Sequence, residues 1–303
     1  MIAVIDIGTN TMKLLIARKE GHHFISEHFD RLPAKLGKGG MKKGILTEDA
    51  IQRSIEILSQ FKTDCETRKV DRIKVTATSA VRSASNGREF VAQVKTDLGL
   101  EIEVIDGERE ADLIWKGVKL TGLLDGDIGL IMDIGGGSTE FILADNEEVI
   151  WKKSYDLGVT RIAERFQSPD PFDTASEMKM NSELDKDMSE LWQILRYHPV
   201  KRLIGASGSF NSISLMLAQG EEDLVPEVWE QIEIDRYKFL SERLRRSDFD
   251  TRSVIPGLVP DRVDTISYSA LLIDLVLKKG KIQALYRSTY ALKEGLMDEI
   301  MNN

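Results

Sequence analysis

Apolar residues form short runs at the start of the chain and adopt a helical spacing further on. Three short runs bounded by Gly, Thr and Asn predict strands, at residues 2–7, 12–18 and 23–30. Beyond them, apolar residues recur every three or four positions, at Ile51, Ile55 and Leu58. This spacing predicts a helix that begins after an N-cap at Thr47 and ends near residue 68.

The same two patterns continue through the rest of the chain. They predict a strand, a helix, a strand and a helix, at 72–77, 87–97, 101–105 and 108–120. Three further strands are expected at 128–134, 140–145 and 148–154. The remainder is predicted to be mainly helical, with strands at 202–205 and near 282–286 and a last helix around 287–301.

A glycine-flanked segment at 122–126 is the expected boundary between two domains. It divides the chain into an N-terminal domain, residues 1–124, and a C-terminal domain, residues 125–303, each long enough for its own core. We expect the last helix to pack back toward the first domain.

The two halves contain an internal repeat. Residues 6–17 align without gaps on residues 133–144, an offset of 127, and each segment begins after one apolar run and ends in another. Residues 76–79 correspond to residues 205–208 at an offset of 129. Three strands, a helix, a strand, a helix, a strand and a helix, repeated once, predict an α/β fold of the duplicated actin-like, ribonuclease H-like type, with a cleft between the halves.

Each repeated segment predicts a β-hairpin whose turn can hold a phosphate. Such turns point backbone N–H groups inward, and small side chains let an anion approach closely. The candidate phosphate-binding residues are Thr9, Asn10 and Thr11 in the first turn and Gly136, Gly137, Ser138 and Thr139 in the second. Asp133 and Glu140 flank the second turn and Asp6 precedes the first, so we expect these three carboxylates to bind Mg²⁺ directly or through water.

Composition narrows the classes of function. The 303 residues are 42% apolar and carry a net charge of −9, which argues against a general nucleic-acid binder because such proteins present a basic face. The single cysteine, Cys65, excludes an internal disulfide and a cysteine-rich zinc site. The opening run MIAVIDIGTN lacks the cationic start of a signal peptide, so we expect a cytoplasmic protein without a membrane span.

Five motifs along nearly the whole chain carry a family resemblance. They are AVIDIGTNTMKLLIA, TSAVRSA, VIDGEREADLIWKGV, IMDIGGGSTEFILAD and IGASGSFNSI. In this order they resemble the exopolyphosphatase and guanosine pentaphosphate phosphatase (Ppx/GppA) family, in its short two-domain form. The resemblance implies a magnesium-dependent hydrolase of phosphoanhydride bonds, with Glu110 as the catalytic glutamate and Arg82 as a phosphate-binding arginine. It also implies that a loop of the second domain contacts the phosphates, through Gly205, Ser207, Gly208 and Ser209. Lys293 stands where the family commonly has arginine.

The resemblance leaves the substrate open. Inorganic polyphosphate is the first expectation, guanosine pentaphosphate the alternative, and an actin-fold kinase or ATPase a third; a nucleotide could also bind without being the preferred substrate. Four lysines in a glycine-rich segment are compatible with a basic lip that guides polyanions and also with a solvated loop, at Lys35, Lys38, Lys42 and Lys43. A homodimer is compatible with the sequence, which carries no signal that decides it.

Overall fold

The structure is a computed structural model that describes residues 1–21, 23–222 and 228–302. Its first half contains a five-stranded sheet of order β3-β2-β1-β4-β5, in which β1 pairs antiparallel with β2 and parallel with β4. The elements of this half are β1 Ile2–Ile7, β2 Thr11–Glu20, β3 His23–Pro33, η1 Met41–Lys43, α1 Glu48–Thr67, β4 Arg72–Ala77, α2 Ser79–Ser83, α3 Gly87–Leu98, β5 Ile102–Val104 and α4 Gly107–Lys119.

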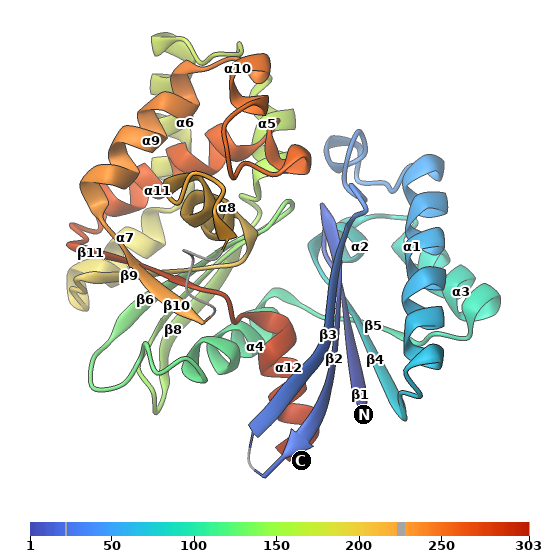
Figure 1. Ribbon diagram of the computed structural model, residues 1–303. Helices are drawn as coiled ribbons and strands as arrows, with labels where there is room; N and C mark the ends of the chain where they lie inside the picture. Colours follow the sequence, from blue (N-terminus) through green and yellow to red (C-terminus); the bar gives the residue numbers. More distant parts are fainter. Residues whose placement is uncertain (22, 223–227, 303) are drawn as a thin grey trace.

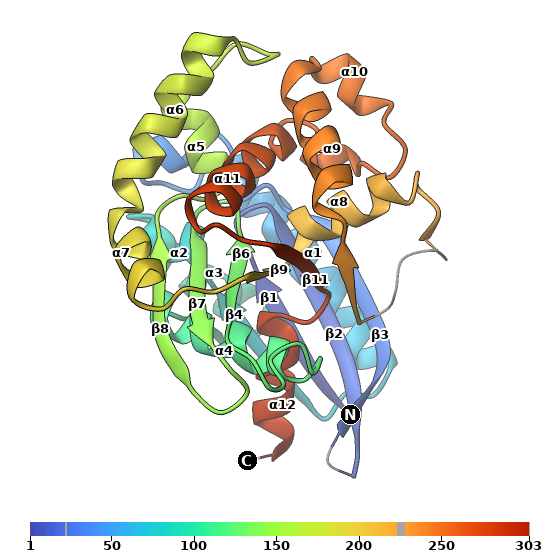
Figure 2. The same ribbon diagram turned by 90° about the vertical axis from the view of Figure 1, so that its left-hand side faces the viewer.

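The second half contains a six-stranded sheet of order β10-β11-β9-β6-β7-β8. Most of its helices gather at one end of the sheet, above the strands in Figure 2. The elements of this half are β6 Gly129–Ile134, β7 Thr139–Ala144, β8 Val149–Tyr155, α5 Val159–Phe166, α6 Thr174–Asp187, α7 Ser189–Tyr197, β9 Arg202–Ala206, α8 Gly208–Leu217, β10 Trp229–Ile232, α9 Ile234–Arg246, α10 Phe249–Ser253, η3 Pro260–Arg262, α11 Ile266–Lys279, β11 Ala284–Ser288 and α12 Leu292–Asn302.

The two sheets repeat one topology. The order β8-β7-β6-β9-β11 in the second half matches β3-β2-β1-β4-β5 in the first, and β10 adds one edge strand. In both halves the first two strands form the antiparallel hairpin that the internal repeat predicted. The chain therefore has the duplicated actin-like fold, and its halves lie side by side in Figure 1.

Two features of the last third of the chain differ from the sequence prediction. Strand β10 was not expected, and the last helix begins at Leu292 instead of near residue 287. Arg287 and Ser288 continue strand β11, because Arg287 pairs with Gly205 on β9 and Ser288 pairs with Trp229 on β10. The pairing of a strand with two neighbours overrides the local helical pattern here.

Helix starts follow their capping residues. The Thr47 hydroxyl accepts a hydrogen bond from the Ala50 N–H at 3.3 Å, so the predicted N-cap of α1 is confirmed. The Asp106 carboxylate accepts from the Arg109 N–H at 2.8 Å and caps α4 in the same way. This cap fixes the first turn of α4, which carries Glu110.

The core between the halves depends on helices α4 and α12. One buried cluster combines Val4 and Leu15 of the first sheet with Ile131 and Ile142 of the second. Helix α12 packs against α4 and strand β1, and α4 also packs against β7 and β8. The two helices approach closely because Gly295 faces the backbone of α4: a Cβ there would lie 1.9 Å from the carbonyl oxygen of Leu113.

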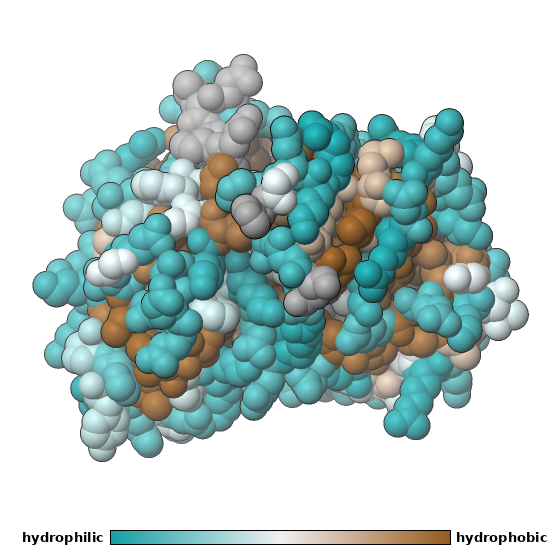
Figure 3. Space-filling model, turned by 90° about the horizontal axis from the view of Figure 1, so that it is seen from below, coloured by the Kyte–Doolittle hydropathy of each residue, from teal (hydrophilic) through white to brown (hydrophobic). Residues whose placement is uncertain are grey.

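Hydrophilic and hydrophobic side chains alternate over the face of the molecule shown in Figure 3. Within residues 1–21, 23–222 and 228–302, no helix has both the length and the apolar character needed to cross a membrane.

Candidate functional site

The two glycine-rich turns line one cavity between the halves. Gly8 of the first turn and Gly135 of the second both lie in its wall, and the cavity has a volume of about 80 Å³. Because one water-sized group needs roughly 10–15 Å³, the space is large enough for a small polar group such as a phosphoryl group. The predicted site residues that line it are Asp6, Thr9, Asn10, Thr11, Glu110, Asp133, Gly136, Gly137, Ser138, Glu140, Ser207 and Gly208.

Three of the predicted phosphate-binding residues make internal contacts instead of lining this cavity. The Thr139 hydroxyl donates to a backbone carbonyl oxygen at 2.8 Å. A Cβ on Gly205 would lie 2.0 Å from the ring of Phe210, so this glycine makes room for a core side chain. The Ser209 hydroxyl lies 2.9 Å from that of Ser269 in a buried pair. Their contacts support the loops that carry the neighbouring cavity residues.

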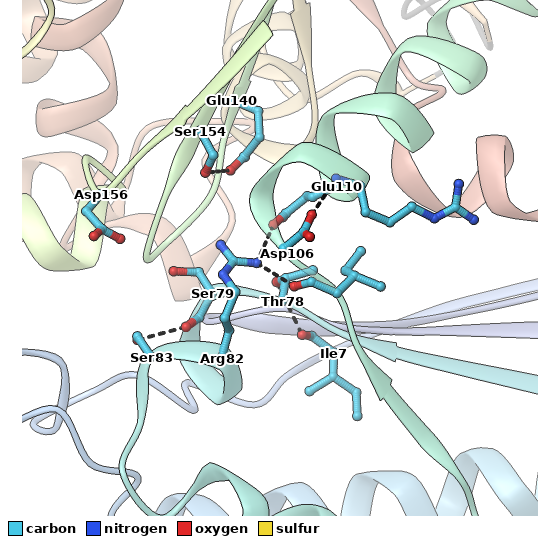
Figure 4. Close-up of polar contacts among 12 residues, drawn as sticks. Ile7, Thr78, Ser79, Arg82, Ser83, Asp106, Glu110, Glu140, Ser154 and Asp156 are labelled. Carbon is cyan, nitrogen blue, oxygen red and sulfur yellow. Dashed lines mark hydrogen bonds and ion pairs between the residues drawn. The ribbon is translucent and has the colours of Figure 1, made fainter.

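Glu110 and Arg82 form a partly buried ion pair at the edge of the cavity. Arg82 Nη1 donates to Glu110 Oε2 at 3.0 Å and to the carbonyl oxygen of Ile105 at 2.8 Å, as Figure 4 shows. Burial, and then the charge of Glu140, raise the pKa of Glu110 well above its ordinary value, while Arg82 lowers it. Arg82 itself is not part of the cavity wall, and its hydrogen bonds are to Glu110 and Ile105.

Asp133 and Glu140 stand directly opposite each other on the hairpin of β6 and β7. Both are buried, at 8% and 1% exposure. Burial, and then the charge of Asp133, raise the pKa of Glu140 to about 7. The Ser154 hydroxyl donates to Glu140 Oε1 at 2.7 Å and orients this carboxylate from strand β8 (Figure 4). Two opposed carboxylates in a buried site favour the binding of a cation.

The first hairpin differs at the equivalent position. Asp6 pairs across the strands with Lys13, and Lys13 Nζ lies 3.3 Å from Asp6 Oδ2. Lys13 occupies the place that Glu140 has in the second hairpin, since 140 and 13 differ by the offset of the repeat. The carboxylate of Asp6 therefore already has a cationic partner, whereas those of Asp133 and Glu140 face each other.

The residues present fit a magnesium ion. Within the part of the chain that the structure describes, no group of three His, Cys, Asp or Glu is arranged to hold a metal by itself. Mg²⁺ is commonly held by one or two carboxylates and completes its shell with water and substrate phosphate. Asp133 and Glu140, buried together and both with a raised pKa, supply such a pair.

Several cavity residues were missed or left unassigned by the sequence analysis, and four of them carry polar or charged side chains that can contact an anion. Lys13 and Arg262 line the cavity, and burial lowers the pKa of Arg262 to about 10. A Cβ on Gly208 would lie 1.7 Å from Arg262 Nη2, so the glycine makes room for the guanidinium. Ser79 Oγ lines the cavity, is buried, and has no hydrogen-bond partner among the described residues. Lys293 also lines it, with its ammonium paired to Glu294.

A signal for two of these residues was present in the sequence. Lys13 lies within the repeat, and Ser79 lies in the loop that corresponds to residues 205–208. Arg262 ends the short 3₁₀ helix η3 before α11, where no periodicity relates it to the cavity. Its position follows from long-range packing and could not be read from local pattern.

Comparisons with known proteins agree with this geometry. Residues 15–303 match the Ppx/GppA phosphatase family. The chain is 33% identical to an exopolyphosphatase from Cytophaga hutchinsonii, with a TM-score of 0.96 over 99% of this chain and 97% of that one. It is 25% identical to a Ppx/GppA family member from Aquifex aeolicus, with a TM-score of 0.83 over 99% and 97% of the two chains. The chain therefore belongs to the Ppx/GppA phosphatase family.

Proposed function

We propose that the protein is an exopolyphosphatase that hydrolyses the terminal phosphoanhydride bond of inorganic polyphosphate. The observation that carries the proposal is the single cavity in which two glycine-rich turns face Glu110, Asp133 and Glu140. The likeness to an exopolyphosphatase at 33% identity over almost the full length supports the choice of substrate. Hydrolysis of a terminal phosphoryl group needs a positioned water, a base and positive charge around the phosphoryl oxygens.

Glu110 is the proposed general base. It accepts a proton from the attacking water while the water oxygen bonds to the terminal phosphorus, and the bridging P–O bond breaks with its electrons staying on the shortened chain. Its raised pKa brings the carboxylate closer to the pH at which a base works efficiently. Arg82 donates one hydrogen bond to the Ile105 carbonyl oxygen, which fixes its guanidinium, and one to the Glu110 carboxylate, which it thereby keeps directed toward the cavity.

The two glycine-rich turns, the cationic side chains and the metal ion are proposed to hold the phosphate. Backbone N–H groups of the two turns, with the hydroxyls of Thr9 and Ser79, surround the cavity, and Arg262 adds a guanidinium from the second half. Asp133 and Glu140 are the proposed ligands of Mg²⁺, with Asp6 as a third carboxylate nearby. When bound, the ion supplies positive charge that offsets the charge of the phosphoryl oxygens.

Guanosine pentaphosphate is the second candidate substrate, because the matching family contains both kinds of phosphatase in its name. Polyphosphate and guanosine pentaphosphate both end in a phosphoanhydride, so the cavity by itself is compatible with either substrate. ATP hydrolysis or phosphate transfer on the same fold is a third candidate. Phosphate release from polyphosphate, guanosine pentaphosphate and ATP, measured side by side with Mg²⁺, separates the three.

The proposal is tested by Glu110→Gln, which keeps the size of the side chain and removes the base. We expect turnover of polyphosphate to fall by roughly 10²–10⁴-fold. Glu108→Gln is the matched control, because Glu108 lies in the same helical turn with its side chain 81% exposed. Turnover of Glu110→Gln equal to wild type would remove Glu110 as the base, and absence of phosphate release by the wild-type protein would remove polyphosphate as the substrate.

A further inference from the structure

The guanidinium group of Arg262 reaches the cavity without a partner of its own. Within the part of the chain that the structure describes, its side chain makes no hydrogen bond and no ion pair, although it lines the cavity. The neighbouring carboxylate does not neutralise it, because Asp261 pairs with Arg31 of β3. The guanidinium packs directly on the backbone at Gly208, where a Cβ would lie 1.7 Å from its Nη2. Its direction therefore depends on the backbone from which it projects.

This backbone is the end of η3, a 3₁₀ helix of three residues. The Arg262 N–H donates to the carbonyl oxygen of Val259 at 3.0 Å, and the Arg262 carbonyl oxygen accepts from the Thr265 N–H at 2.9 Å. Short 3₁₀ segments have poor hydrogen-bond geometry, so these local bonds contribute little stability of their own. Contacts from outside the segment are needed to hold Arg262 in one place.

Arg252 of α10 supplies such a contact to the residue directly after Arg262. Its Nε donates to the carbonyl oxygen of Val263 at 3.0 Å. Its Nη1 and Nη2 donate to the two carboxylate oxygens of Asp170, at 2.6 and 3.0 Å, and Nη1 also donates to the carbonyl oxygen of Ser247. A bidentate pair of this kind fixes the plane of the guanidinium. Arg252 thus ties the end of η3 to the segment after α5 and to the end of α9.

Arg252 belongs to the interior of the protein and not to the cavity. It is 2% exposed and does not line the cavity. Helix α10 lies at the upper end of the second half in Figures 1 and 2. A buried charge is costly unless it is paired and hydrogen-bonded, and the four hydrogen bonds of Arg252 meet that requirement. An effect of Arg252 on phosphate binding therefore passes through the backbone that it holds.

We propose that Arg252, held by Asp170, is a positioning residue. It fixes the backbone at Val263 so that Arg262 directs its guanidinium at the phosphoryl oxygens in the cavity. The inference rests on the proposed function and adds to it a pair of residues, outside the cavity, on which the phosphate contact depends. A lysine in place of Arg252 keeps the charge but cannot bond the Val263 carbonyl and both Asp170 oxygens together.

A double-mutant cycle tests the proposal. Arg252→Lys is made in wild type and in Arg262→Gln, which lacks the guanidinium, and kcat/KM is measured with polyphosphate and Mg²⁺. Asp170→Asn is a second and milder variant, because the Asp170 side chain is 41% exposed and the amide oxygen that replaces its carboxylate still accepts a hydrogen bond. It carries the test if Arg252→Lys does not fold.

We expect Arg252→Lys to lower kcat/KM at least about tenfold in wild type, since a misplacement of about 1 Å caused by a distant substitution can cost about 10²-fold. In the Arg262→Gln background, the same substitution should change kcat/KM by less than about twofold, because the guanidinium that it misplaces is gone. Asp170→Asn should show the same pattern with a smaller loss.

Arg245→Lys is the matched control for the loss of a buried arginine. The Arg245 side chain is 14% exposed, and its ion pairs go to Glu177 and Asp274, outside η3. Urea unfolding compares the stability of the two lysine variants. We expect both to be destabilised, while kcat/KM of Arg245→Lys stays within about twofold of wild type, because it leaves the backbone at Arg262 in place.

Two results would overturn the proposal. One is an equal fall of kcat/KM in both backgrounds, which would mean that Arg252 supports the fold in general; the other is a kcat/KM of Arg252→Lys within twofold of wild type. Failure of the proposed function looks different, since wild type then releases no phosphate from polyphosphate. The cycle is then read in the affinity for inorganic phosphate, measured by calorimetry. A loss confined to the proteins that retain Arg262 supports the positioning role, and an equal loss, or no phosphate binding by wild type, overturns it.

Discussion

The contact between α4 and α12 makes Gly295→Ala an informative perturbation. A Cβ on Gly295 would lie 1.9 Å from the carbonyl oxygen of Leu113 and 2.9 Å from the N atom of Gly117, both on the backbone of α4. Backbone atoms of a helix cannot rotate away as a side chain can. Since real Cβ atoms essentially never approach within 3.0 Å, the helices must separate by about 1.1 Å, which is 3.0 minus 1.9.

The cost of this separation competes with a gain in helix propensity. Gly→Ala in the interior of a helix stabilises by about 1 kcal/mol, whereas inserting a methyl group into a close-packed contact costs about 1–3 kcal/mol. Because the obstacle is backbone, we expect the upper part of that range and a net loss of about 1–2 kcal/mol. Helix α4 also carries Glu110 one turn before Leu113, and a shift of this size near a catalytic group can cost about 10²-fold in rate.

Urea unfolding at neutral pH and kcat with polyphosphate measure the two effects. Ser59→Ala on the exposed face of α1 is the control for propensity, and it should change stability by only a few tenths of a kcal/mol. If Gly295→Ala were stabilised by about 1 kcal/mol and fully active, the close approach of the helices would be wrong.

Three further predictions test the electrostatics. Arg82→Lys cannot reproduce both hydrogen bonds of Arg82, so kcat should fall about 10²-fold with KM nearly constant. The acidic limb of the pH–rate profile should also move to higher pH, because Arg82 lowers the pKa of Glu110. An acidic limb at the same pH as in wild type would exclude Arg82 as the residue that tunes Glu110. Asp133→Asn should raise the Mg²⁺ concentration for half-maximal activity at least tenfold, and an unchanged metal titration would remove Asp133 as a ligand. Hydrogen bonds from Arg109 chiefly, and from Lys116, lower the pKa of Glu299 to about 2, so this carboxylate stabilises the fold above about pH 4.5 and loses that effect as the pH falls toward 2. Because its partners are about a third exposed, Glu299→Gln should cost about 1–2 kcal/mol in urea unfolding at pH 7, a difference that disappears toward pH 2; a difference independent of pH would contradict it.

Much of the fold follows from the sequence because each hairpin of the repeat is formed by residues that are close together in the chain. The hairpin of residues 6–17 and that of residues 133–144 each carry their turn residues and both strands within twelve positions, so pattern alone predicts them. The capping side chain of Thr47 is equally local. The end of β11 could not be predicted in this way, because its extension through Ser288 depends on pairing with β10, about sixty residues earlier.

The residues of the candidate site also divide into those that the sequence predicts and those that only the packed structure brings together. Glu110, Asp133 and Glu140 reach one cavity as the repeat and the family resemblance implied. Thr139, which has a hydroxyl in the right motif, faces a backbone carbonyl instead, because neighbouring residues of a strand point to opposite sides. Arg262 enters the cavity from η3, about 125 residues after Gly137 of the second turn, and only the packed structure brings it there.

The duplication explains why the two halves contribute unequally to the chemistry. Each hairpin places an Asp at the same position, but the residue opposite it is Lys13 in the first half and Glu140 in the second. Keeping the Glu140 carboxylate ionised at its raised pKa of about 7 costs about 3 kcal/mol relative to its ordinary value. A divalent cation bound by Asp133 and Glu140 would recover that cost, whereas Asp6 already has the ammonium of Lys13. A single exchange of a cation for a carboxylate within the repeat thus gives the first hairpin a built-in ammonium group, and for this reason we propose that the second hairpin recruits its positive charge as Mg²⁺.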